Sequence, residues 1–284
     1  MRPRRLIQVI AGPFLLLVLS SGAARAELRP EWEFGLGATG FHLPDYRGSD
    51  ESRGYVLPFP YLIYRGERFR IDRQGVRGIF FESDRVELNL SLNATPPVNS
   101  DENRARQGMP HLDPTLEIGP RLDVTLARDR EREWSFEVRL PVRAAIATDL
   151  SHTQHIGYVA YPHLHLFTRP VLAGVKWNLG LQAGPLFATR EYHDYFYGVD
   201  PEFATPERPA YQASAGYSGA LALASLSRRF PRFWVGAFAR YDTLKGAAFE
   251  PSPLVRRDYA VMAGVAIAWI FAESAKRVEV DIDE

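Results

Sequence analysis

The chain has 284 residues, and its 34 lysines and arginines are balanced by 34 aspartates and glutamates. A formal net charge of zero excludes a strongly basic surface of the kind that binds nucleic acid, so we expect no nucleic-acid partner. The chain contains no cysteine, which excludes disulfides, a thiol nucleophile and thiolate metal ligands.

Residues 1–26 have the pattern of a secretory signal peptide. Arg2, Arg4 and Arg5 give a positive start, an apolar stretch follows, and residues 24–26 read Ala-Arg-Ala, a small-residue cleavage signature. The apolar stretch is too short for an ordinary membrane-spanning helix. We therefore expect this segment to be cleaved and the rest of the chain to be exported.

The exported part alternates apolar and polar residues. In the stretch 85–93, Val86, Leu88, Leu90 and Leu92 are apolar and the residues between them are polar or charged. A period of two is the signal of a β-strand with two different faces. Similar runs occupy 31–42, 115–127, 134–146, 157–167, 174–188, 210–227, 233–244 and 258–271.

The segment 54–82 adds either three short strands or one, and its two prolines make it harder to interpret. Single-chain bacterial barrels have even strand numbers. We therefore predict an all-β chain that forms a transmembrane antiparallel β-barrel of about 12 strands, with about 10 as the alternative. Pro120, on the apolar face of its strand, is expected to mark a bulge or kink.

The connections favour a membrane barrel over a soluble sandwich. Long loops at 43–53, 94–114, 148–156, 189–209 and 245–257 alternate with short links such as 83–84, 168–173 and 228–232. Outer-membrane barrels combine long extracellular loops with short periplasmic turns. We divide the chain into the signal peptide at 1–26, a barrel at 27–271 and a charged C-terminal tail at 272–284, which we expect to extend into the periplasm.

On this interpretation the apolar faces contact outer-membrane lipid and the charged faces line the lumen. The lumen-facing candidates are Arg85, Glu87, Glu117, Arg121, Asp123, Glu137, Arg139, Arg143, Lys176, Arg240 and Asp242. Both signs of charge are present, which argues against strong ion selectivity. A barrel of about 12 strands lies between filled barrels and open pores, and we expect a narrow or closed lumen.

Two sets of residues carry side chains that could serve catalysis or metal binding. Ser151 lies next to His152 and near His155, but adjacent residues of an extended segment point in opposite directions, so we predict no catalytic residue. His163 and His165 share one strand face as a metal half-site, but no third ligand is evident, so we predict no metal and no cofactor.

Four stretches carry a family resemblance: "LPDYRGSD" at 43–50 with the following "LPFPYLIYRG", "IGPRLDVTL" at 118–126, "YGVDPEFATPERPAYQASAGYSG" at 197–219, and "WVGAFARYDTLKGAAFEPSPLV" at 234–255. Together and in this order they resemble the MltA-interacting protein (MipA/OmpV) family of outer-membrane proteins. One departure is that the chain continues beyond the aromatic end of its last strand at 269–271, whereas family members usually end there.

The resemblance implies a place in the outer membrane of a Gram-negative cell and a non-enzymatic role. For the best-known branch it implies a scaffold that brings a periplasmic murein hydrolase together with a murein synthase. Two alternatives stay open from the residues themselves: a narrow porin-like channel for small solutes, and an outer-membrane lipid-modifying enzyme. The oligomeric state is left open.

Overall fold

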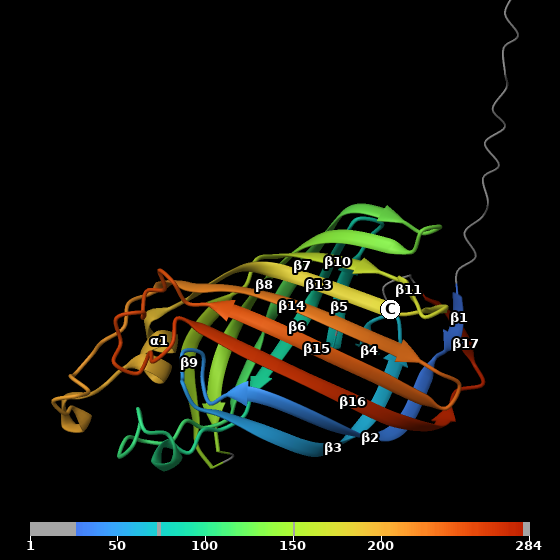
Figure 1. Cartoon of the computed structure of the whole chain (residues 1–284). Helices are drawn as coiled ribbons and strands as arrows, with labels where there is room; N and C mark the ends of the chain where they lie inside the picture. Colours follow the sequence, from blue (N-terminus) through green and yellow to red (C-terminus); the bar gives the residue numbers. More distant parts are fainter. Residues whose placement is uncertain (1–26, 73–74, 150, 281–284) are drawn as a thin grey trace, which may run out of the picture.

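The structure is a computed structural model that describes residues 27–72, 75–149 and 151–280. Its main sheet has 13 labelled strands and closes on itself (Figure 1). Strands β9 and β10 are consecutive parts of one wall strand, because each pairs with β8 on one side and with β13 on the other. The barrel therefore has 12 antiparallel strands, which confirms the predicted fold class. The predicted signal peptide lies outside the described residues.

The wall runs in chain order around the barrel. Its strands are β2 (Trp32–Pro44), β3 (Ser52–Arg65), β4 (Phe69–Asp72), β5 (Gly75–Glu82), β6 (Val86–Thr95), β7 (Thr115–Asp129), β8 (Trp134–Thr148), β9 (Thr153–Ala160), β10 (His163–Thr168), β13 (Asn178–Ala188), β14 (Gly216–Arg229), β15 (Phe233–Thr243) and β16 (Tyr259–Glu273). The break between β9 and β10 falls at Pro162, which has no N–H to donate to the ladder.

Four short strands and three short helices lie outside the wall: β1 (Glu27–Pro30), β11 (Val171–Leu172), β12 (Val175–Lys176), β17 (Arg277–Val280), η1 (Ser100–Glu102), α1 (Arg190–Tyr197) and η2 (Pro201–Phe203). Among the described residues, no helix is long and apolar enough to cross a membrane. The three helices belong to the long loops at one end of the barrel, and β1 and β17 lie at the other end (Figure 1).

The segment 54–82 forms three strands, as the higher of the two predicted counts requires. Pro58 and Pro60 both lie in β3, whose ladder to β2 continues across them. On its other side β3 pairs with β4 only through Tyr64 and Arg65. Alternate residues of a strand direct their N–H groups to the same edge, so the two prolines remove donors from one edge of β3.

The alternation of apolar and polar residues in the sequence corresponds to the alternation of outward and inward side chains in the wall strands. In β7 the side chains of Glu117, Arg121 and Asp123 are buried inside the barrel, whereas Leu116 and Leu126 are exposed on the outside. Exposed apolar side chains recur on the outer face of the other wall strands. Such a continuous apolar outer surface is what a bilayer requires of a barrel.

The link predicted at 168–173 is longer than expected. It contains the β11–β12 hairpin, whose turn residues Ala173 and Gly174 both have positive φ, 50° and 76°. Two such residues make the tight turn typical of two-residue hairpins. The wall strand therefore begins at Asn178 instead of 174, and Lys176 belongs to this hairpin.

The predicted bulge at Pro120 was wrong. Ile118 faces Ala144 and Arg121 faces Pro141, so the register between β7 and β8 is the same on both sides of Pro120. The irregularity of this pair falls later, between Thr125 and Ala127. Pro120 is tolerated because the ladder with β8 is interrupted at 119–120 without any shift of register.

The end of the chain is also organised. The last wall strand continues to Glu273, past the expected boundary at 271, and β17 then pairs with β1 in a two-stranded sheet. The register joins Glu27 to Val280 and Pro30 to Arg277. Part of the predicted tail is therefore a strand that returns to the start of the described chain.

Gly119 is a position where β7 and β8 approach closely. A Cβ there would lie 2.0 Å from the carbonyl oxygen of Val142, a backbone atom that cannot turn aside. We expect Gly119→Ala to destabilise the barrel by about 2 kcal/mol or more, since the overpacked strands must separate. Gly54→Ala is the matched control, because nothing lies within 4 Å of its added Cβ. Urea unfolding of the refolded variants should separate the two, and equal stabilities would contradict this account of Gly119.

Candidate functional site in the barrel lumen

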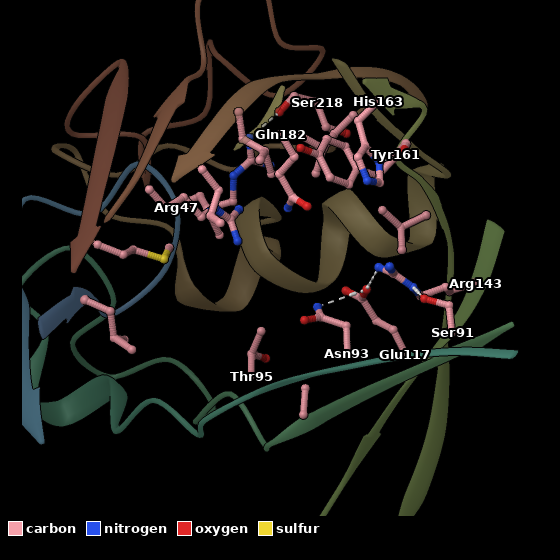
Figure 2. A pocket seen from close by; sticks show the side chains of 18 of the residues that line it. Arg47, Ser91, Asn93, Thr95, Glu117, Arg143, Tyr161, His163, Gln182 and Ser218 are labelled. Carbon is pink, nitrogen blue, oxygen red and sulfur yellow. Dashed lines mark hydrogen bonds and ion pairs between the residues drawn. The ribbon is translucent and has the colours of Figure 1, made fainter. Parts of the chain in front are cut away.

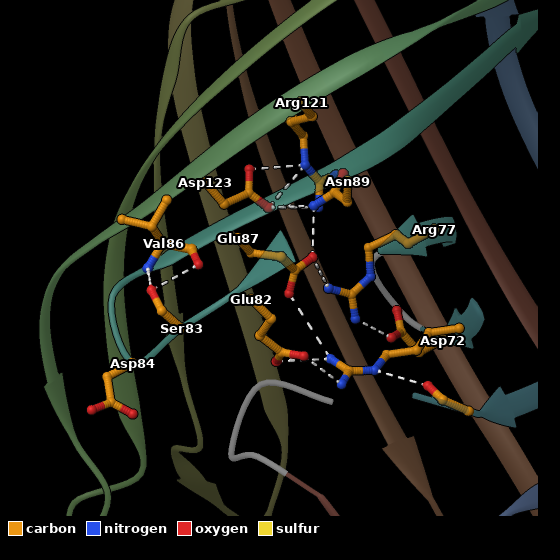
Figure 3. Close-up of polar contacts among 12 residues, drawn as sticks. Asp72, Arg77, Glu82, Ser83, Asp84, Val86, Glu87, Asn89, Arg121 and Asp123 are labelled. Carbon is orange, nitrogen blue, oxygen red and sulfur yellow. Dashed lines mark hydrogen bonds and ion pairs between the residues drawn. The ribbon is translucent and has the colours of Figure 1, made fainter. Parts of the chain in front are cut away.

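The first group of lumen charges links β4, β5, β6 and β7 (Figure 3). Arg77 bonds to Asp72 and, at 2.9 Å, to Glu87. The amide of Asn89 donates to Glu87 at 2.6 Å and to Asp123 at 3.1 Å. Arg121 completes the chain with an Nε to Asp123 distance of 2.9 Å. Arginines and carboxylates thus compensate one another across four strands, as buried charges must.

A second group is centred on Glu117 (Figure 2). Its carboxylate accepts from Arg143 at 3.3 Å and from the amide of Asn93 at 3.1 Å. The hydroxyl of Tyr192, from α1, donates to the other oxygen at 3.0 Å. Arg143 also donates to Ser91 at 2.9 Å. The carboxylate therefore ties helix α1 to the inner wall of β6, β7 and β8.

Asp242 is the centre of a third group. Its fully buried carboxylate binds Arg240 of the same strand, with Nε 2.7 Å away, and Arg47 of the loop after β2, with Nε also 2.7 Å away. Arg47 continues to the carbonyl oxygen of Ser218 at 2.8 Å. Two guanidinium groups share one carboxylate, so this region of the lumen carries an excess of positive charge.

The two lumen histidines lie near a fourth pair. Arg139 binds Glu137 with an Nε to Oε2 distance of 2.9 Å, and the His165 Nδ1 atom lies 3.8 Å from the same carboxylate. His163 stacks on Tyr161 at 4.2 Å between ring centroids and donates to that residue's carbonyl oxygen. Among the described residues, no group of three or more side chains is arranged to hold a metal ion.

The long loops form a folded cap over one end of the lumen. We call the segments 45–51, 96–114, 189–215 and 244–258 the cap; the buried apolar side chains of all four make one cluster. At its centre the rings of Tyr197 and Phe249 stack at 3.7 Å. The His193 ring is fully buried beside Phe249 and bonds to the Ser214 carbonyl oxygen at 2.6 Å and the Ser218 hydroxyl at 2.5 Å.

Beneath the cap lies a cavity of about 530 Å³. Five arginines line it, namely Arg47, Arg121, Arg139, Arg143 and Arg240. Within the described part of the chain, the carboxylates in its lining are Asp45 and Glu117. Polar and apolar side chains of β13 and β14, such as Gln182 and Leu223, form another part of the wall. This volume is in the range of cavities that hold small organic molecules.

Comparison with known proteins gives the chain its relatives. The family model of MltA-interacting protein MipA matches residues 36–271. The chain belongs to this family. It is 23% identical over 232 residues to the outer membrane protein OmpV of Vibrio cholerae, which covers 79% of this chain and 81% of OmpV. This is therefore an outer-membrane β-barrel of the MipA family, as the four quoted stretches predicted.

Solved structures with a similar shape are also outer-membrane proteins. A bacterial polysaccharide outer membrane secretin matches with a TM-score of 0.39 and 9% identity, over 84% of this chain and 99% of that one. OprB of Pseudomonas putida matches with a TM-score of 0.34 and 9% identity, over 85% and 94% of the two chains. At these values the matches are descriptive only.

Within this MipA-family barrel, most of the proposed lumen residues lie in the ion-pair groups just described. Arg85 and Lys176 lie elsewhere: Arg85 is exposed in the turn before β6, and Lys176 pairs with Glu133 from its hairpin. Sequence reasoning missed Arg47 and Tyr192, which reach the lumen from loops. Loops have no two-residue period that would indicate the direction of a side chain.

The loop with Ser151 shows a local turn. The Ser151 hydroxyl donates to the Asp149 carboxylate at 2.8 Å, and the backbone N–H of His152 donates to the same carboxylate oxygen at 2.7 Å. These bonds lower the pKa of Asp149, with the His152 bond contributing most. The contacts are those of an aspartate that stabilises a loop.

We expect Asp242→Asn to lower the free energy of unfolding by about 3 kcal/mol, because it leaves Arg47 and Arg240 without their shared negative charge in a buried site. Asp258→Asn is the control, since Asp258 pairs with Lys245 at 3.5 Å on the exposed surface and its loss should change stability by less than about 1 kcal/mol. Chemical unfolding in detergent would measure both variants, and an unaltered Asp242→Asn barrel would contradict the role given to this carboxylate.

The cap should loosen in acid through His193. Burial lowers the pKa of His193 below its ordinary value of 6.5, so the folded cap favours the neutral ring. The stability that depends on this ring is fully present above pH 6.5 and is lost as the pH falls from there through the folded-state pKa. Hydrogen exchange of residues 190–199, corrected for the intrinsic rate, should show lower protection at pH 5 than at pH 7.5. The dependence should be absent in His193→Gln; the same dependence in that variant would assign it to another group.

Proposed function

We propose that this barrel is a non-enzymatic interaction protein that presents its periplasmic end to enzymes of murein remodelling, a hydrolase and a synthase. The description of the matching family, MltA-interacting protein, supports a role in protein contact. The observation that carries the proposal is the cap, because a folded apolar cluster over the lumen would obstruct the passage of solutes through a general diffusion pore.

The ion pairs beneath the cap support the same function. Groups centred on Glu117 and Asp242 hold cap residues Tyr192 and Arg47 against the wall. Opening a passage along this route would break charge-assisted hydrogen bonds in a buried setting, which is costly. A barrel closed in this way at the cap favours contacts made by its outer surfaces over the passage of solutes from end to end.

The β1–β17 sheet is the contact surface that we assign to the periplasmic partner. It lies at the end with the short turns, and Leu28 in it is 63% exposed. Within the described residues the sheet has only two strands, so each strand has one edge open to a further strand. Addition of an extended segment to an open edge is a common mode of peptide recognition.

The alternative function is a narrow channel for small solutes, and the cavity of about 530 Å³ is the observation in its favour. A lipid-modifying enzyme is the third candidate. It requires a histidine base in contact with Ser151, whose hydroxyl is instead bonded to Asp149.

Two measurements on the refolded protein distinguish these functions. In a planar bilayer we expect no steady conductance, and a photo-crosslinker at Leu28 should capture a murein enzyme from the periplasm. The same crosslinker at exposed Glu207 in the cap is the control and should capture none. Steady conductance whose ion selectivity shifts in Arg139→Glu, without capture from Leu28, would replace the interaction function with the channel.

A further inference from the structure

One long edge of β3 is unpaired over most of its length. β3 bonds to β2 along Ser52–Arg65 but to β4 only through Tyr64 and Arg65. On the far side of the short β4–β5 hairpin, β6 pairs with β5 only over 87–89. Within the described residues, the extracellular half of the wall therefore has a gap in its hydrogen bonding between β3 and β6, which we call the β3–β6 seam.

A seam of this kind needs a physical explanation in a membrane. Hydrocarbon offers no hydrogen bonds, so unpaired backbone groups that face lipid are expensive. Pro58 and Pro60 reduce that expense on β3 because neither has an N–H. Prolines that remove N–H donors from a strand edge are typical of edges that do not pair with a further strand.

The inner face beside the seam is apolar and uncovered. Leu57 shares the inward parity of Tyr61 and Ile63, which are buried, yet it is 47% exposed. Further along the same face, Phe41 of β2 stacks on Tyr55 of β3 with 5.3 Å between ring centroids. This part of the lumen offers apolar contacts in place of the ion pairs found elsewhere.

The cavity beneath the cap reaches the seam. Its lining includes Val76 of β5 and Leu92 of β6, and Leu92 belongs to the outward parity of its strand and is 38% exposed. The preceding residue, Ser91, accepts a hydrogen bond from Arg143 at 2.9 Å. An apolar side chain on the membrane side of β6 is thus next in sequence to the residue that binds a guanidinium of the cavity.

The wall of the cavity includes a set of donors for an anion. Arg121, Arg139 and Arg240 line the cavity, whereas their carboxylate partners Asp123, Glu137 and Asp242 do not. Arg143 also lines the cavity, together with its partner Glu117. Asp123, Glu137 and Asp242 therefore lie behind their guanidinium groups and fix their orientation. Guanidinium groups held in this manner suit phosphate and carboxylate ligands.

Tyr161 adds a donor without a partner. Its side chain lines the cavity and is only 7% exposed, and its hydroxyl has no hydrogen-bond partner among the described residues. Figure 2 shows it beside His163 on the same wall as Gln182. A buried polar group without a partner is rare in folded proteins and indicates a missing ligand or water.

We propose that the cavity binds one acidic amphiphile taken from the membrane through the β3–β6 seam. Its alkyl chain lies against Leu57 and Leu92, and its phosphate or carboxylate head accepts hydrogen bonds from Arg143, Arg139 and the Tyr161 hydroxyl. Access is lateral because the cap covers the extracellular end of the lumen.

The seam is tested with single cysteines, for which a cysteine-free chain is well suited. A bimane label is placed at Leu57 beside the seam, at Leu221 on the closed wall and at outward Val265, and the barrels are reconstituted with brominated lipids. Leu57 and Leu221 both have inward parity, so only an open seam gives the Leu57 label strong quenching, close to that at Val265. Quenching at Leu57 no greater than at Leu221 would overturn the proposal.

The anion site is tested by mass spectrometry of the intact barrel from neutral detergent, with dodecyl phosphate, laurate and uncharged dodecanol as probes. We expect one molecule of an acidic probe per barrel and no retention of dodecanol. Arg143→Gln should weaken binding about tenfold, since it removes charge-assisted hydrogen bonds. Arg229→Gln, a lumen arginine outside the cavity lining, should leave binding unchanged.

Tyr161→Phe is the second variant, because it removes a single hydroxyl and keeps the ring that stacks on His163. It should weaken binding about fivefold. Dodecanol binding as well as dodecyl phosphate, or equal affinities in all variants, would overturn the proposal. Preference between dodecyl phosphate and laurate would identify the head group as phosphate or carboxylate.

Discussion

Every backbone N–H and C=O in the hydrocarbon region needs a hydrogen-bond partner within the protein, and the rest of this barrel depends on that constraint. It requires β16 to pair with β2, and it keeps β9 and β10 in one wall strand although Pro162 interrupts them. The same constraint applies to the unpaired edge of β3. An open edge is tolerated in hydrocarbon only where its backbone N–H and C=O groups are fewer or are hydrogen-bonded by other groups.

Inside the barrel the constraint is that buried charges need partners of opposite sign. On three wall strands an arginine and a carboxylate lie two residues apart: Arg121 with Asp123, Glu137 with Arg139, and Arg240 with Asp242. Side chains two residues apart share one face of a strand, so each strand compensates its own charge before it meets its neighbours. The cap then binds to wall carboxylates that already have partners, since Arg47 binds Asp242 and Tyr192 binds Glu117.

Much of this could be predicted from the sequence. The direction of a side chain along a strand is a local property, so the alternation in 85–93 and 115–127 predicts which residues are inside and how many strands cross. The position of Lys176 was predicted wrongly, because the strand expected from the sequence begins at Gly174, which lies in a turn with Ala173; the glycine is the one local signal of that turn. The cap was beyond reach because its cluster joins four loops distant in sequence, and neither His193 nor Phe249 carries a local pattern that indicates its burial.

The pairing of β1 with β17 has a topological consequence. Glu27 faces Val280, so the two ends of the described chain meet at one small sheet. The fold is therefore almost a closed ring of chain, and a short covalent link between these ends would make it one without moving a wall strand. In such a ring, the barrel architecture would accommodate new ends in an exposed loop of the cap.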